Sequence, residues 1–127
     1  MQKRINPVDL VLDIKKDIYL EHISSYKGTL NTPPSDNKDM LYEGVRFYQS
    51  LNEKSLFFYL FKNSILDTIS NVFGWLDGAY YLENQTENLE LKFEKSANKI
   101  NGCLQDIWLA IEEGEDIDDL RKLYEAF

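Results

Sequence analysis

The chain has one cysteine, one histidine and three prolines among its 127 residues, and these scarcities exclude several classes of protein. The lone Cys103 cannot form an intrachain disulfide or a thiolate metal cluster, so a reducing, cytoplasmic compartment is expected. No apolar run approaches the ~20 residues of a membrane span, and the charged N-terminus does not resemble an export signal. The length predicts a single domain over residues 1–127 that buries a core without disulfides or a structural metal.

Basic side chains are also few: 14 Lys and Arg stand against 22 Asp and Glu, which gives a net charge of −8. Such a field repels a phosphate backbone and an anionic membrane surface, so neither nucleic acid nor a membrane is an expected partner. A charged partner is instead expected to be a basic protein. Hydrophobic residues make up 43% and charged residues 28%, a balance typical of a folded globular chain.

The most apolar and most periodic stretch runs from Ser50 to Gly78. At helical spacing its apolar side chains fall within roughly 140°, the arc of a helix that faces a core. Ser50 and Glu53 fit a capping box, and Gly78 can adopt the left-handed conformation that ends a helix. The sequence therefore predicts a central core helix at about 51–77, around which the other elements pack. The predicted inward side chains are Phe58, Phe61, Ile65, Leu66, Ile69, Val72, Phe73 and Leu76.

A first helix is expected to begin with Asn6 as its N-cap and Pro7 at the first helical position, and to end near Ser24. Alternation of apolar residues over 8–14 would also fit a strand, but the polar residues that follow favour the helix. Its inward stripe would consist of Val11, Ile14 and Ile18.

Residues 25–38 collect glycine, proline, serine and asparagine, and this composition predicts a loop. Ser35 or Asp36 can then cap a second helix, which is expected to end near Ser50. The predicted inward face of that helix consists of Leu41, Val45 and Tyr48.

Two interpretations compete for the segment after Gly78. In the first, residues 89–101 form a short β-hairpin and Asn101 caps a helix; in the second, one helix runs from 89 to 111. The hairpin is favoured because Gly102 inside a helix would cost about 1 kcal/mol relative to alanine. The predicted fold class is therefore α+β, mainly α, with four to five helices around the central one; the alternative is an all-α bundle. Either way Leu104, Ile107, Trp108 and Ile111 form an inward face.

The C-terminal segment predicts one more helix, because Gly114 can stop the preceding helix and Asp116 can cap the next. Its expected inward residues are Ile117, Leu120, Leu123, Tyr124 and Phe127.

The densest charge in the chain is a run of six carboxylates in eight residues, between the last two predicted helices. It lacks the alternating ligands and the central glycine of an EF-hand loop, so no metal or cofactor is predicted. The run fits either a solvated turn, with acids at a helix N-terminus, or a docking surface for a basic partner. The predicted partner-binding residues are Glu112, Glu113, Glu115, Asp116, Asp118 and Asp119.

Catalysis is not expected, because no nucleophile motif accompanies His22 or Cys103. Three apolar side chains, Phe57, Tyr59 and Leu60, fall outside the inward stripe of the central helix. Either a second layer of helices covers them, or they form an exposed patch for a partner or a dimer.

Two motifs resemble the second half of small, acidic, uncharacterised bacterial domains: the helix end FGWLDG, residues 73–78, and the helix start INGCLQDIWL, residues 100–109. Some small acidic proteins of this kind are similar to immunity proteins of bacterial toxin and contact-dependent inhibition systems, which bind and block a neighbouring toxin. The resemblance implies an immunity-like or inhibitory protein that neutralises a basic partner. No residue matches a toxin-binding motif, so no contact residues are implied. A small enzyme that uses Asp and Glu side chains and a homodimeric structural module are the alternatives.

Overall fold

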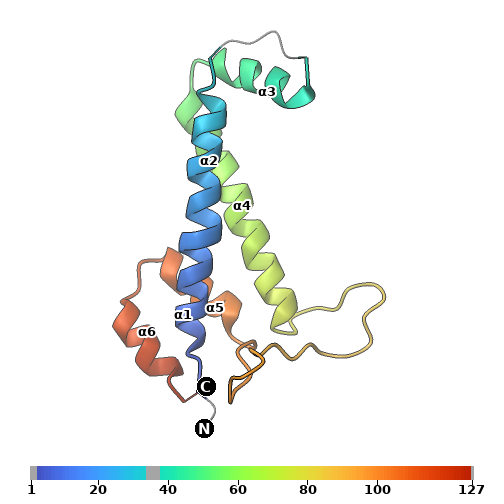
Figure 1. The fold of residues 1–127 in the computed structure, drawn as a ribbon, viewed down its shortest axis with the longest axis vertical. Helices are drawn as coiled ribbons and strands as arrows, with labels where there is room; N and C mark the ends of the chain where they lie inside the picture. The colour runs from blue at the N-terminus through green and yellow to red at the C-terminus, as the bar shows by residue number, and fades with distance from the viewer. Residues whose placement is uncertain (1–2, 34–37, 127) are drawn as a thin grey trace.

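The computed structural model describes residues 3–33 and 38–126. Figure 1 shows an elongated molecule in which two long helical rods run in opposite directions, with one short helix across one end and two short helices at the other. We call residues 21–33 and 38–69 the tip, and residues 3–20 and 70–126 the base. In chain order the helical elements are α1 (Pro7–Ile14), a π-helical segment (Lys15–Leu20), α2 (Glu21–Leu30), α3 (Met40–Gln49), α4 (Lys54–Leu76), α5 (Leu104–Glu112) and α6 (Ile117–Tyr124).

The first rod begins as predicted but continues further. The Asn6 side chain accepts a hydrogen bond from the backbone N–H of Val8 at 3.0 Å, which confirms the N-cap. The helix does not end near Ser24, because α2 continues to Leu30; the loop predicted from residue 25 therefore starts six residues too early. Gly28 lies within the helix, so it does not act as a stop.

The inward stripe of this rod changes register at the π-helical segment. Ile18 is 59% exposed, so its predicted inward position is wrong, whereas Tyr19 and Ile23 are buried. An α-helical register that starts at Val11 would place residues 18 and 22 inward. A π turn contains one more residue than an α turn, and this delays the buried positions by one.

The second rod, α4, starts later than predicted. Ser50 does not form a capping box; its hydroxyl donates to the carbonyl of Phe47 at 2.6 Å and closes α3. Gly78 has φ +86°, as expected at a helix end. Even α4, with its 23 residues, is not apolar enough to cross a membrane, and neither is any other helix in the described part of the chain.

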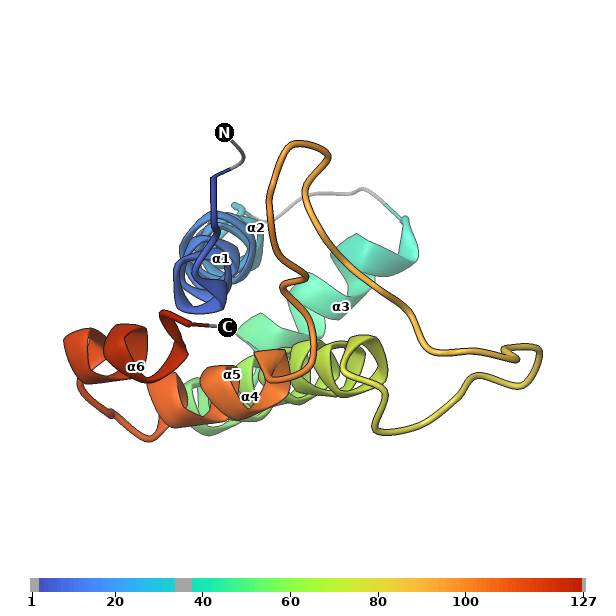
Figure 2. The same cartoon turned by 90° about the horizontal axis from the view of Figure 1, so that it is seen from below.

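The core is centred on α5 and not on α4, which corrects the prediction of a central helix at 51–77. The predicted inward face of α4 is confirmed except at Val72, which is 47% exposed, but among its members only Phe73 is fully buried. The other six are partly buried against the core: Phe58, Phe61, Ile65, Leu66, Ile69 and Leu76. Helix α5 packs against both α1 and α4, so its apolar side chains are covered from two directions. Figure 2 shows α6 beside α5 and close to α1. The most completely buried side chains of α1 and α5 are Val8, Val11, Leu104, Ile107 and Trp108.

Helix α3 lies across the tip and packs loosely. It ends near Ser50 as predicted, while the predicted caps Ser35 and Asp36 lie outside the described residues. Of its predicted inward face only Val45 is buried, and Leu41 is 49% exposed. The apolar side chains of α3 therefore lie on the predicted face of the helix, but few other residues pack against that face.

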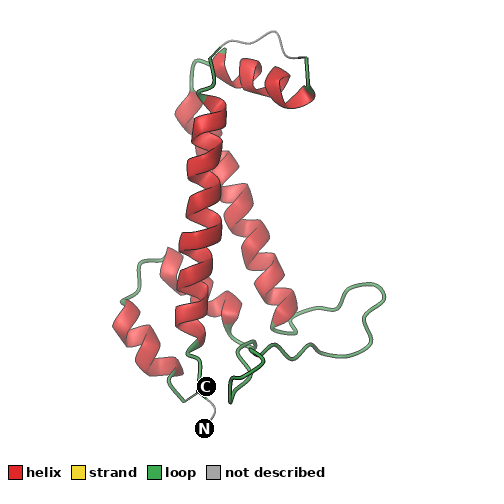
Figure 3. Ribbon diagram, viewed as in Figure 1, coloured by secondary structure: helices red, strands yellow, loops and turns green. Residues whose placement is uncertain are grey.

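No strand is present in the described residues, so the predicted hairpin is wrong (Figure 3). The chain does turn tightly, with the N–H of Ser96 donating to the carbonyl of Phe93 at 3.0 Å. Between the two arms, the N–H of Ile100 donates to the carbonyl of Leu91, and the Asn101 side chain supplies the other links. A side-chain amide thus replaces a backbone ladder. The long-helix alternative is also wrong, because α5 begins only at Leu104.

The C-terminal helix is capped as predicted and covers one side of the base. The Asp116 carboxylate accepts from the N–H of Asp119 at 3.0 Å, and Leu120 is buried. Leu123 is 72% exposed, so its predicted inward position is wrong. Phe127 lies outside the described residues.

Candidate functional site: the acidic turn between α5 and α6

The run of six carboxylates forms the reversal between α5 and α6 at the base. Gly114 adopts φ +83°, a left-handed conformation that lets the chain leave α5. The N–H of Glu115 then donates back to the carbonyl of Ala110 at 3.0 Å, which satisfies the helix end. Asp116 follows at once as the cap of α6. Local chain chemistry therefore builds the turn, as the sequence predicts.

Three of the six carboxylates already have partners within the chain. Glu112 forms an ion pair with Lys15 at 2.8 Å, in which both side chains are only about a quarter exposed, at 28% and 27%. Asp116 is occupied as the helix cap, and Asp118 lies 3.3 Å from the guanidinium of Arg121. Of these three, only Glu112 joins distant segments through a partly buried ion pair, whereas Asp116 and Asp118 make contacts within α6 and Asp118 remains 83% exposed.

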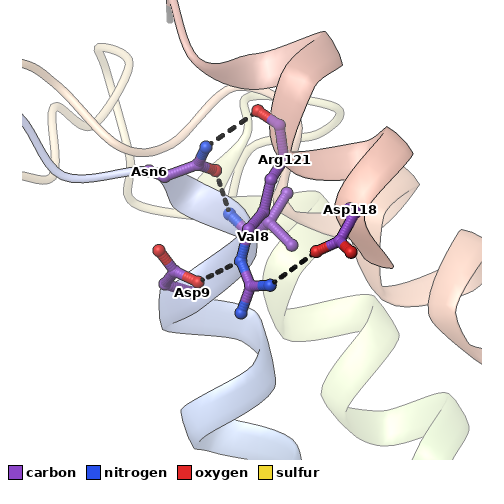
Figure 4. A network of polar contacts seen from close by, with 5 residues as sticks. All are labelled: Asn6, Val8, Asp9, Asp118 and Arg121. Carbon is purple, nitrogen blue, oxygen red and sulfur yellow. Dashed lines mark hydrogen bonds and ion pairs between the residues drawn. The ribbon is translucent and has the colours of Figure 1, made fainter. Parts of the chain in front are cut away.

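Arg121 links α6 to the start of α1 (Figure 4). Its Nε donates to the carboxylate of Asp9 at 2.8 Å, and its backbone carbonyl accepts from the amide of Asn6 at 2.9 Å. The hydrogen bond and the negative charge of Asp9 raise the pKa of the Arg121 guanidinium. The N-cap of the first helix and the last helix are thus held by one network.

The other three carboxylates, Glu113, Glu115 and Asp119, are exposed and make no side-chain hydrogen bond or ion pair with the rest of the described chain. Glu115 and Asp119 line a shallow hollow of about 290 Å³, which the exposed Leu123 borders on the apolar side. No group of three or more possible metal ligands gathers anywhere in residues 3–33 and 38–126. The turn therefore offers an open acidic rim beside an apolar side chain.

The two candidate reactive side chains, His22 and Cys103, are not brought together. His22 is exposed at the tip, where its ring contacts Tyr26 and Phe61 at centroid distances of 5.0 and 6.3 Å. Burial first, and then the charges of Asp106 and Asp77, raise the pKa of the Cys103 thiol in the base. A raised thiol pKa is the opposite of what an activated nucleophile needs.

Asp77 is a key residue that sequence reasoning missed. Its Oδ1 accepts from the N–H groups of Gly102 and Leu104 at 2.6 and 3.1 Å, and its Oδ2 accepts from Gln105 at 2.8 Å. A carboxylate at the end of α4 thus caps α5. The predicted cap, Asn101, is wrong, because its amide donates to carbonyls of the preceding segment instead. The only signal in the sequence was the acid directly before Gly78.

Close packing joins the same two helices at Gly74. A Cβ on this glycine would lie 2.9 Å from Oε1 of Gln105, so only glycine leaves room for that side chain. The Gln105 amide uses this space to donate to the carbonyl and the hydroxyl oxygen of Ser70 at 2.9 and 3.2 Å. A glycine in the middle of a predicted helix was the available signal for a close approach.

These joint residues belong to the FGWLDG and INGCLQDIWL motifs, whose structural role is to fasten α4 to α5. Within the described residues the motifs supply no group of possible metal ligands. Comparison with known proteins adds no relative: no protein-family model, no curated protein and no solved structure matches the chain.

Proposed function

We propose that the chain is a protein–protein interaction module that binds a basic protein through its base, in the manner of an immunity or inhibitory protein. The uneven distribution of charge carries this proposal. The base holds nine basic and sixteen acidic side chains, whereas the tip holds five of each. A field concentrated at one end steers a cationic partner to that end and raises its association rate.

The uncommitted carboxylates supply the expected contacts. Glu113, Glu115 and Asp119 can each accept hydrogen bonds from Lys or Arg without breaking an internal contact, and Leu123 adds an apolar anchor beside them. Glu112, Asp116 and Asp118 contribute to the field but are engaged within the chain. The proposed contact surface is therefore narrower than the six residues that the sequence predicts.

A nucleic-acid-cleaving toxin is the class of partner that best suits this surface. Such a toxin needs positive charge to hold a phosphate backbone, so an acidic inhibitor would use a surface that the toxin cannot lose. The immunity-like part of the proposal comes from the sequence resemblance. The lone thiol Cys103 suits a reducing cytoplasm, where we place the protein.

Affinity capture from the native host, with the wild type and two charge variants as baits, tests the proposal. Glu113→Gln, Glu115→Gln and Asp119→Asn together remove the uncommitted charges. Glu83→Gln, Glu87→Gln and Glu90→Gln, at exposed sites in residues 79–103, remove the same net charge elsewhere in the base and form the matched control.

Stopped-flow association with the captured basic protein then separates the two variants. We expect the first to lower the association rate about tenfold and the control by less than about twofold, with a wild-type rate that falls steeply as salt is added. Equal effects of both variants would mean that the net charge of the base, and not these three residues, sets the association rate. If no basic protein is captured, the proposal is wrong.

A further inference from the structure

The tip carries an apolar groove of about 250 Å³ between the end of α2, the inner face of α3 and the start of α4. Its walls include Tyr26 from α2, Leu41 and Tyr48 from α3, and Phe57 and Phe61 from α4. None of the described residues that line it is charged. The groove is smaller than the 300–1,000 Å³ of typical ligand pockets, so it suits one or two inserted side chains better than a cofactor.

Large apolar side chains continue from the groove onto the surface. Met40 at its rim is 81% exposed, and Phe57 in its wall is 43% exposed. Leu56 and Leu60, at 60% and 66%, lie one helical turn apart and so share a face of α4 next to Phe57. The alternative that a second layer of helices covers Phe57, Tyr59 and Leu60 is therefore wrong for the described residues, because all three side chains are exposed. A cluster of exposed apolar side chains beside an apolar groove is typical of an interaction surface.

Helix α3 has few packing partners. It has ten residues and buries only Val45, and isolated helices of this length are marginal in water. The amide of Gln49 ties its end to the carbonyls of Leu30 and Thr32 at 2.9 and 2.8 Å. An occupant of the groove would provide the apolar contact that α3 lacks.

Charge selects a second copy of this chain as an occupant. The described tip has five basic and five acidic side chains, so two tips meet without net repulsion. Two bases would bring seven excess negative charges against seven. Helix α4 has 23 residues and spans roughly 35 Å, several times the ~8 Å Debye length, so the bases of a tip-to-tip pair are well screened from each other.

We infer that the chain forms a two-fold symmetric dimer through its tips, in which the exposed Met40 at the groove and the exposed Leu60 on the adjoining face of α4 pack against the groove of the other copy. The same patch carries both projections and a slot, which is what a symmetric interface requires. The dimer leaves both acidic turns free at its far ends, and it uses a different surface from the proposed binding of a basic protein.

Sedimentation equilibrium from about 1 to 500 μM tests the dimer with one variant and a matched control. Leu60→Glu places a charge on an exposed face of α4 at the tip without entering the core, and should raise the dissociation constant at least tenfold. Leu123→Glu makes the same change at an exposed leucine of the base and should leave the constant within about twofold. A wild type that stays monomeric to 500 μM, or equal effects of both variants, would overturn the inference.

Mixing and salt provide a second check. Leu60→Glu and Leu60→Lys should each stay monomeric, both alone and when mixed, because each charge would meet the uncharged groove of the other copy and not the opposite charge. Added salt should leave the wild-type dimer nearly unchanged, because the bases are already screened from each other, whereas it should weaken binding of a basic protein. A mixture that dimerises would overturn the seating of residue 60 against the groove, and it would leave the proposed function of the base unaffected.

Discussion

The base and the tip contain similar apolar side chains but bury them to very different degrees. In the base α5 lies against both α1 and α4, and Trp108 is 1% exposed; in the tip only Ile23 and Val45 are buried hydrophobics. The first turns of α4 are among the most apolar in the chain, yet Leu60 is 66% exposed there. Burial thus depends on how many elements surround a side chain, and hydrophobicity alone does not secure it.

The largest expected effect is the loss of the tryptophan at the centre of the base. Trp108→Ala should lower the free energy of unfolding by about 3–5 kcal/mol, because the cavity also removes ring contacts with Tyr19 and Phe73. Urea unfolding measures the change. Tyr59→Ala at an exposed site of the tip is the control and should change stability by less than about 0.5 kcal/mol. Similar losses in the two variants would contradict the contrast between the two ends.

The same substitution at one buried valine in each region sharpens the comparison. Val11→Ala in the base removes two methyl groups from a fully buried site and should cost about 2 kcal/mol of global stability. Val45→Ala should change global stability by less than about 0.5 kcal/mol, because α3 can open while the base stays folded.

Native-state hydrogen exchange at low micromolar protein separates these outcomes. Val45→Ala should speed exchange of the α3 amides about tenfold and leave the α5 amides unchanged, whereas Val11→Ala should speed both. Slower or unchanged exchange in α3 would mean that the helix is not held by Val45.

Asp77 tests whether the base depends on a cap supplied across two helices. Asp77→Ala removes the acceptor for three backbone N–H groups and should cost about 1–2 kcal/mol, measured by thermal or urea unfolding. Asp77→Asn keeps one acceptor oxygen and should lose less. Equal losses in both variants would point to the negative charge at the helix N-terminus, and not to the hydrogen bonds, as the source of stability.

The smallest effect at neutral pH concerns Tyr19 in the base. Burial, and secondarily the charge of Glu112, raise the pKa of its phenol above the ordinary value of 10. Above pH 10 the unfolded chain loses this proton while the native state keeps it, so stability is fully present below pH 10 and falls as the pH rises further. Tyr19→Phe should flatten that fall in urea midpoints measured from pH 8 to 11. An unchanged profile would mean that other groups cause the loss of stability at alkaline pH.

The sequence by itself determined the features that depend on a few neighbouring residues. Asn6 and Asp116 cap their helices through their own side chains, and Gly78 and Gly114 end helices because glycine tolerates positive φ. The inward face of α5 also followed from helical spacing alone. The acidic turn was located correctly, because six carboxylates between two helix signals are visible in the sequence.

Only the tertiary structure decided the features that join distant segments. One extra residue in the π turn moved burial from Ile18 to Tyr19, and Asp77 took the capping role expected of Asn101. The tertiary structure also divided the acidic turn into engaged and free carboxylates, since Lys15 lies far from it in sequence. The core moved from α4 to α5 for the same reason: periodicity reports which face of a helix is apolar, but burial requires other elements to surround that face.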